Sequence, residues 1–444
     1  MKKTVLLLAG GLLLATAAQA QWVQQPFSFA QDLLPLYTDA VDANTAWALS
    51  SGLFTQDAAN QVARTFNGGQ NWTVLTVSGV NTATETVQSL SAVSATTAWV
   101  VTLNDTGGRI LKTSDGGSTW VRQGTNAFSA DSYPNTIYFF NANEGMVMGD
   151  PDGTNGGGPE IYYTANGGTT WTRSLNVPVG TPDEYGTFFP PAAVGNSIWF
   201  PNDEGDIFHS TDKGVTWTVA RGVASEPIEN IAFRDEQNGL AVIADANATN
   251  HELYRTADGG ITWRRTTYTG PLRGWGLDNV PGTGNYLSVG INLGNGDSGS
   301  SYSRDNGQTW TSIENNINHL FVDAAGPTAV WSGAVNASTG AGAGVNKLTS
   351  TVLPTRAATV VLGASVTPNP STDGFFRVQW PTATHTGTIV LTVADALGRQ
   401  LQQRTLEASR ATEATLDLSQ QKAGVYHIKL ESLAGVSRLR AQVL

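Results

Sequence analysis

The sequence predicts an all-β protein, in which a seven-bladed β-propeller is followed by a small C-terminal β-sandwich of immunoglobulin-like type. Three observations support this prediction. A hairpin motif that ends in tryptophan recurs six times, with its tryptophans 46 to 51 residues apart. Each interval also holds three further short strand-like segments, and four strands at such a period are typical of propeller blades. The repeat then stops, and a new composition occupies residues 366–444.

Residues 1–20 have the features of a secretory signal peptide. Lys2 and Lys3 precede an apolar run from Val5 to Ala15, and Ala18-Gln19-Ala20 follows. A basic start, a short apolar run and an A-x-A site predict cleavage after Ala20. An uncleaved anchor is the alternative, but the run is shorter than the roughly 20 apolar residues that a membrane span needs. We therefore expect a secreted protein.

Each repeat follows, with small variations, the pattern Ser/Thr-x-Asp-x-Gly-x-Thr-Trp. The Asp or Asn is expected to accept hydrogen bonds from backbone N–H groups two or three residues on. The glycine permits positive φ, the Thr-Trp pair should start the returning strand, and the indole can fill the gap between sheets. The residues of the six hairpins are Asn67, Gly69 and Trp72; Asp115, Gly117 and Trp120; Asn166, Gly168 and Trp171; Asp212, Gly214 and Trp217; Asp258, Gly260 and Trp263; and Asp305, Gly307 and Trp310.

Residues 21–348 are predicted to form the propeller. The second blade illustrates the strands, which we expect at 87–93, 98–102, 109–113 and 119–122. After Trp310 only three strand-like pieces remain, whereas Gln21-Trp22-Val-Gln-Gln-Pro26 is similar to the segment around Trp120. Trp22 is therefore expected to complete a seventh blade, which removes two exposed sheet edges. A six-bladed ring with unpaired flanks is the alternative.

The hairpin pattern resembles the Asp box, or BNR repeat, of sialidase-like propellers. The run Gly145-Met-Val-Met-Gly149-Asp150-Pro151, with the hairpin consensus, also resembles the photosystem II assembly factor (Ycf48/Hcf136-like) branch of this superfamily. In that branch the ring is a binding scaffold rather than an enzyme. The resemblance implies a scaffold here, without the photosystem role.

Residues 349–365 are predicted to be a linker, and residues 366–444 resemble the type A C-terminal sorting domain of the type IX secretion system in Bacteroidetes. The matching residues include Pro368, Asn369 and Pro370; Gly398 and Arg399; and Gly424, Val425 and Tyr426. The aromatic residue that often precedes Pro-Asn-Pro is missing. The resemblance implies that the secretion machinery is a partner and that the protein is released or held at the outer-membrane surface. An immunoglobulin-like carbohydrate module is the alternative.

Composition excludes several classes of function. The chain has no cysteine, which rules out thiol catalysis and cysteine metal sites, and its net charge is −11. Between residues 21 and 362 there are 15 Lys/Arg and 30 Asp/Glu, and from 363 to 444 there are 8 and 6. An acidic propeller argues against nucleic acid as a partner. We expect a monomer that binds a glycan or an extracellular protein.

Four loop carboxylates are candidates for a catalytic pair, namely Asp150, Asp152, Asp203 and Asp206. An inverting glycoside hydrolase needs two carboxyl groups about 6.5–9.5 Å apart around a water molecule. Solvated loop carboxylates are the alternative. A sialidase would need an arginine cluster, and the few candidates are Arg109, Arg234 and Arg273.

A calcium site is a further possibility at Asp150, Asp152 and Asn155, because alternating oxygen ligands before a glycine suit a hard cation. Glu160 falls one residue early for the closing ligand of an EF-hand, so a loop stabilised by its own side chains is the alternative. No other cofactor is expected.

Trp275 is the candidate for a ligand contact, with Arg273, Asp183 and Glu184 as further binding candidates and core packing as the alternative for Trp275. Together these observations predict a non-catalytic binding scaffold. A glycoside hydrolase acting on extracellular polysaccharide and a structural adhesin are the alternatives, because fold alone does not decide function.

Overall fold

The computed structural model describes residues 22–30, 33–52, 58–104, 107–124, 127–128, 133–151, 158–179, 185–187, 189–244, 250–336, 338–349, 364–380, 388–395, 399–407, 412–432 and 435–444. The predicted signal peptide and its cleavage site at Ala20 lie outside these residues. The chain divides into two compact units, Met1–Pro354 and Thr355–Leu444. No α-helix occurs among the described residues, so they contain no helix that could cross a membrane.

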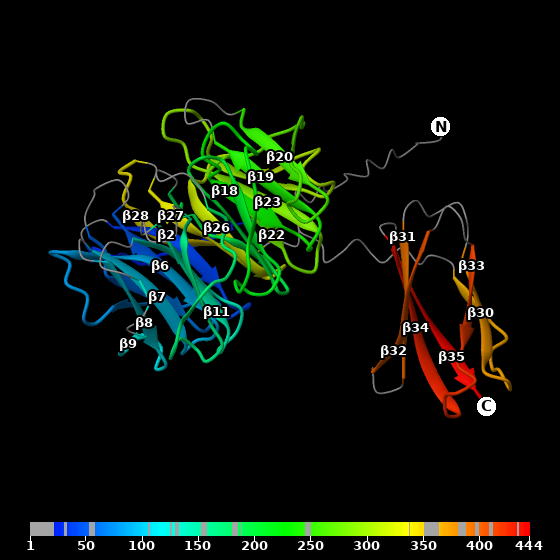
Figure 1. Cartoon of the computed structure of the whole chain (residues 1–444). Helices are drawn as coiled ribbons and strands as arrows, with labels where there is room; N and C mark the ends of the chain where they lie inside the picture. The colour runs from blue at the N-terminus through cyan, green and yellow to red at the C-terminus, as the bar shows by residue number, and fades with distance from the viewer. Residues whose placement is uncertain are drawn as a thin grey trace, which may run out of the picture. The chain divides into compact units, whose positions relative to one another are not determined.

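The first unit consists of seven four-stranded antiparallel sheets, which confirms the predicted seven-bladed propeller (Figure 1). The first three blades are β2 (Leu34–Ala40), β3 (Ala46–Ser51), β4 (Gln61–Thr65) and β5 (Thr73–Thr76); β6 (Glu85–Ala92), β7 (Ala98–Asn104), β8 (Gly107–Thr113) and β9 (Val121–Gln123); and β10 (Pro134–Phe139), β11 (Gly145–Gly149), β12 (Glu160–Thr164) and β13 (Thr172–Arg173). The next three are β14 (Ala192–Val194), β15 (Ser197–Pro201), β16 (Ile207–Ser210) and β17 (Thr218–Ala220); β18 (Asn230–Phe233), β19 (Gly239–Ile243), β20 (Glu252–Thr256) and β21 (Arg264–Thr266); and β22 (Gly276–Val280), β23 (Asn285–Gly290), β24 (Gly299–Ser303) and β25 (Thr311–Glu314).

The seventh blade joins the two ends of the propeller sequence. It consists of β26 (His319–Gly326), β27 (Ala329–Val335), β28 (Gly342–Leu348) and β1 (Trp22–Gln25). β1 pairs antiparallel with β28, with Trp22 opposite Leu348. The Trp22 indole is buried between the sixth and seventh blades, and its Nε1 donates a hydrogen bond to Ser300 Oγ at 2.8 Å. The segment Trp22–Gln25 therefore supplies the outer strand that the last repeat lacks.

Each repeat hairpin is closed by side chains at its two ends. In the second blade, Asp115 Oδ1 accepts from the Thr119 N–H at 2.9 Å, and Oδ2 accepts from the Thr119 hydroxyl at 2.7 Å. Thr113 Oγ1 accepts from the Gly117 N–H at 2.8 Å. The main bonds of the aspartate thus reach four residues on, further than the two or three expected from sequence. The six repeat glycines all have positive φ, between 79° and 91°.

The returning strand begins after the tryptophan, not at the Thr-Trp pair as expected. β9, for example, starts at Val121. The physical reason is that Asp115 already uses the N–H of Thr119, so this residue cannot join the strand ladder. The Trp120 indole packs against Trp47 and Leu49 of the first blade, between the two sheets.

A second set of tryptophans was missed by the sequence analysis. Trp47, Trp99, Trp199 and Trp331 lie on the second strands and are fully buried. Trp99 Nε1 donates to Gly167 O at 3.0 Å, and Trp199 Nε1 donates to Gly259 O at 2.8 Å. Trp99 and Trp199 therefore fasten their own blades to the repeat hairpin of the next blade, whereas Trp47 Nε1 donates to Ser94 O in the turn between β6 and β7 at 3.0 Å.

The second unit has two sheets around its own core. The smaller contains β29 (Ser365–Thr367), β30 (Phe375–Gln379) and β33 (Glu413–Asp417); the larger contains β31 (Thr388–Ala394), β32 (Gln400–Glu407), β34 (Gly424–Ser432) and β35 (Gly435–Val443). Asn369 is fixed to β35, because its Nδ2 donates to Arg440 O and its Oδ1 accepts from the Gln442 N–H. Arg399 Nε pairs with Asp395 Oδ2 at 2.7 Å, and Gly398 lies outside the described residues.

Candidate binding face

The antiparallel order of strands gives the propeller two different faces. The repeat hairpins join third to fourth strands, so they lie on the same face as the turns between first and second strands. The opposite face carries the loops between second and third strands and the links between blades, and we call it the loop face. Because loops on a rigid scaffold commonly carry binding and catalytic groups, the predicted site residues are considered on this face.

Asp150 and Asp203 flank the same short stretch of backbone. Asp150 Oδ1 accepts from the Gly186 N–H at 2.9 Å and from Asn135 Nδ2 at 2.5 Å. Asp203 Oδ1 accepts from the Tyr185 N–H at 2.8 Å. Burial raises the pKa of the Asp150 carboxyl, and the nearby negative charge of Asp203 raises it further. Both carboxylates therefore hold the link before the fourth blade.

Asp206 stabilises the link between the fourth and fifth blades in a similar way. Its Oδ2 pairs with Arg221 Nη1 at 2.5 Å, and its Oδ1 accepts from the Gly222 N–H at 2.6 Å. Asp152, Asn155, Asp183 and Glu184 lie outside the described residues. Within the described residues there is no group of three or more His, Asp or Glu side chains arranged to hold a metal ion.

The three arginines considered for a sialidase cluster are all engaged in ion pairs. Arg109 pairs with Glu85, and Arg234 pairs with Asp235 at 3.1 Å. Arg273 is buried, and its Nη1 lies 3.5 Å from Asp297 Oδ1. Asp297 also lies 3.2 Å from His251 Nε2 and accepts from the Gly274 N–H. Arg273 thus belongs to a buried polar cluster that supports the segment just before β22, which carries Trp275.

Trp275 is half-buried in a group of aromatic rings, just before β22, the first strand of the sixth blade. Its ring centroid lies 6.1 Å from that of Phe321, and Phe189 and Tyr37 pack on the same phenylalanine at 5.6 and 5.1 Å. These rings come from four different parts of the propeller and join its blades near the axis. Trp275 therefore contributes to packing, the alternative that the sequence analysis left open.

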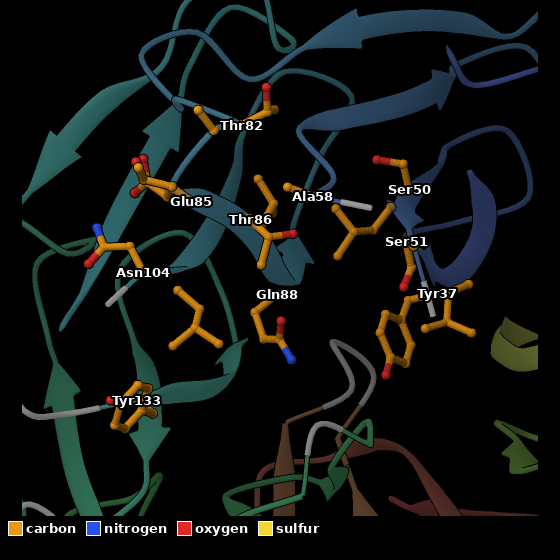
Figure 2. A pocket seen from close by; sticks show the side chains of 17 residues that line it. Tyr37, Ser50, Ser51, Ala58, Thr82, Glu85, Thr86, Gln88, Asn104 and Tyr133 are labelled. Atoms are coloured by element: carbon orange, nitrogen blue, oxygen red, sulfur yellow. The ribbon is translucent and has the colours of Figure 1, made fainter. Parts of the chain in front are cut away.

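A cleft of about 490 Å³ lies between the first and second blades (Figure 2). It was not predicted from the sequence. Its walls come from β2, the end of β3, the link before β6, β6 itself and the end of β7. Figure 2 shows Tyr37 and Tyr133 on opposite sides, with Gln88 between them in this view. A volume of this size lies within the range of small-molecule sites, roughly 300–1,000 Å³.

Among the described residues that line this cleft, Glu85 is the only charged one, and Arg109 neutralises it. Glu85 is buried, accepts from Arg109 Nε at 2.7 Å and from Thr102 Oγ1 at 2.5 Å, and also pairs with Arg109 Nη2. Burial alone would raise the pKa of Glu85, but the hydrogen bonds from Arg109 and Thr102 outweigh it and lower the pKa below its usual value. Arg109 Nη2 also donates to Gly79 O at 2.9 Å, which fixes the link.

Several neutral polar groups in the cleft have no internal partner. The Tyr37 hydroxyl is buried without a hydrogen bond to any described residue, and burial raises its pKa. The side chains of Gln88 and Ser51 line the cleft. Thr86 instead bonds Ala59 across the floor, which closes the bottom of the cleft. The described lining residues therefore offer hydrogen-bond donors and acceptors without net charge.

Three further carboxylates, which were not predicted from the sequence, are buried on the first strands of their blades. Asp278, Asp323 and Asp39 lie on β22, β26 and β2. Each accepts from a backbone N–H of the next blade: Ala324 at 2.8 Å, Ala40 at 2.5 Å and Ala92 at 2.7 Å. Burial raises the pKa of all three, to about 6 for Asp323, and the charge of Asp323 raises the pKa of Asp39 and Asp278 further.

The seven four-stranded sheets form a β-propeller, and a separate C-terminal unit follows it. Comparisons with known proteins support both assignments. Residues 365–440 match the family model described as a secretion system C-terminal sorting domain, so the second unit carries such a domain. The structure titled YCF48 bound to D1 peptide is similar in fold, with a TM-score of 0.52 and 16% identity over 75% of this chain and 98% of that chain.

Two curated relatives match parts of the sequence. The photosystem II stability/assembly factor HCF136 of Arabidopsis thaliana is 27% identical over 152 residues, which is 34% of each chain. A xyloglucanase of a Paenibacillus species is 27% identical over 158 residues, which is 35% of this chain and 15% of the enzyme. The chain spans only a third or less of each relative's length, so their activities are not established for it.

Proposed function

We propose that this protein is a secreted or cell-surface, non-catalytic binding scaffold, exported through the type IX secretion system by means of its signal peptide and C-terminal domain. The match of residues 365–440 to a secretion system sorting domain carries the export half of the proposal. The similarity of the propeller to a structure titled with a bound peptide supports a binding role. Its partner is an extracellular glycan or protein.

The contacts made by the loop-face carboxylates support a binding role rather than hydrolysis. Asp150 and Asp203 hold backbone N–H groups, and Asp206 is neutralised by Arg221. A general acid and a general base must instead have their oxygens available to the glycosidic bond and to water. The geometry of these three residues therefore favours a structural role for each.

A glycoside hydrolase is the second candidate, because the raised pKa of Asp150 beside Asp203 is the one feature typical of a catalytic acid. The full chain is incubated with soluble polysaccharides, and both retention of the polysaccharide and new reducing ends are measured. A scaffold gives no reducing ends with any substrate. Hydrolysis that falls at least 10²-fold in Asp150→Asn or Asp203→Asn would instead establish the enzyme.

A further inference from the structure

We propose that the cleft between the first and second blades binds a neutral saccharide unit. This inference rests on the proposed scaffold function and narrows it to one ligand class and one place on the loop face. The cleft was recognisable only from the structure, because six separate stretches of the chain meet there.

The first argument is the unsatisfied hydroxyl of Tyr37. A buried hydroxyl without a partner costs free energy, so native proteins seldom retain one unless water or a ligand completes it. The Tyr37 ring is held in place by stacking on Phe321, at 5.1 Å between centroids and 26° between planes. Tyr37 therefore lines the cleft on a rigid support, and its buried hydroxyl lacks a hydrogen-bond partner among the described residues.

The balance of charge in the cleft also favours a neutral ligand. The Glu85 and Arg109 side chains neutralise each other, and the other polar side chains among the described lining residues are hydroxyls and amides. An anionic ligand would need an uncompensated cation, and a cationic ligand would need a free carboxylate. A neutral polyol needs neither, because each of its hydroxyls both donates and accepts. Gln88 supplies both functions in one side chain.

The third argument is the exposed aromatic ring opposite Tyr37. Tyr133 is 45% exposed and lines the cleft. A sugar ring presents a flat apolar face of C–H groups, and an aromatic ring covers such a face well. Saccharide binding thus accounts for the hydroxyl groups and for Tyr133 together.

The test titrates the full chain with neutral trisaccharides (cellotriose, laminaritriose, maltotriose and xylotriose) and with anionic trigalacturonate, by calorimetry and by saturation-transfer NMR. We expect at least one neutral trisaccharide to bind and trigalacturonate not to bind. Tyr37→Phe keeps the ring and removes only the hydroxyl, so it should weaken binding about 2- to 10-fold. Gln88→Ala should weaken binding by a similar factor, and Tyr133→Ala roughly tenfold.

Tyr185→Ala is the matched control, because Tyr185 is 48% exposed on the same face but lies at the link before the fourth blade. It should leave the affinity unchanged. Unfolding curves of every variant confirm that the fold is retained. Neutral-sugar binding that survives all three cleft variants would overturn the location, and binding of trigalacturonate alone would overturn the ligand class. Failure of all sugars, with capture of an extracellular protein, would overturn this inference but leave the scaffold proposal intact.

Discussion

At the scale of single residues, the repeat hairpins are held by a few local hydrogen bonds. Asp212 shows the arrangement: its Oδ1 accepts from the Thr216 N–H and from the Ser210 hydroxyl, and its Oδ2 accepts from the Thr216 hydroxyl. All of these partners lie within four residues of Asp212. Such a local pattern is readable from sequence, which is why the hairpins could be predicted.

Replacing Asp212 by Ala should lower the free energy of unfolding by about 1–2 kcal/mol, because the Thr216 N–H and the hydroxyls of Thr216 and Ser210 lose their acceptor. Asp212→Asn should cost less, since Asn67 and Asn166 already occupy the equivalent positions in other repeats. Urea denaturation at pH 7 measures both variants. An equal loss in Asp212→Asn would show that the negative charge, rather than the hydrogen bonds, stabilises the turn.

The same aspartate should make the hairpin sensitive to acid. Burial acts against the charge of Asp212, but the hydrogen bonds from Thr216 and Ser210 outweigh it and lower the pKa. The native state therefore binds its proton less readily than the unfolded chain, and this stabilisation, present at neutral pH, is lost below about pH 4. Asp212→Asn should show a smaller loss of stability between pH 5 and pH 3.

At the scale of strands and sheets, the last blade depends on β1. Trp22→Ala removes a buried indole and its bond to Ser300, and should cost about 3–5 kcal/mol. Trp217→Ala is the control, because Trp217 is equally buried between blades that are continuous in sequence. Both variants should lower the melting temperature, but only Trp22→Ala should speed hydrogen exchange in β28. Equal exchange in the two variants would contradict a special role for this seam.

The three buried carboxylates on the first strands, Asp39, Asp278 and Asp323, should give the stability of the propeller a pH dependence opposite to that of Asp212. Burial raises the pKa of Asp323 to about 6 and also raises those of Asp39 and Asp278, while Tyr138 on β10 faces the same three charges. A carboxyl with a raised pKa binds its proton more tightly in the native state, so stability should rise as the pH falls from 8 towards 5. Asp323→Asn should raise the melting temperature at pH 8 and flatten this rise. A steeper rise in the variant would refute the assignment.

The first-strand carboxylates and the second-strand tryptophans left a weaker signal in the sequence. Asp39, Asp278 and Asp323 all lie opposite the same position of their second strands, which is Trp47, Leu287 and Trp331. Aligning the repeats by strand instead of by hairpin would have brought these residues into one column. The cleft left no such signal, because Tyr37, Gln88 and Tyr133 occupy different repeat positions and meet only through the packing of neighbouring blades.

At the scale of the whole molecule, the two units have separate tasks under the proposed function. Deleting residues 364–444 should leave the propeller folded, because each unit has its own core. The truncated chain should remain inside the cell envelope, whereas the full chain should reach the surface or the medium. Fractionation and immunoblotting measure the distribution. Unaltered export of the truncated chain would refute the role proposed for the C-terminal unit.

The pairing of β1 with β28 sets an order of events during biogenesis. β1 leaves the ribosome first among the strands of the propeller, but its partner is encoded more than 300 residues later. Until β28 has followed, both strands have open edges, and the outer strand of the seventh blade can be supplied by another copy of the chain as well as by its own. Slow or interrupted synthesis between these two strands would therefore favour molecules linked in pairs or chains by exchanged N-terminal strands, each with a complete ring of seven blades.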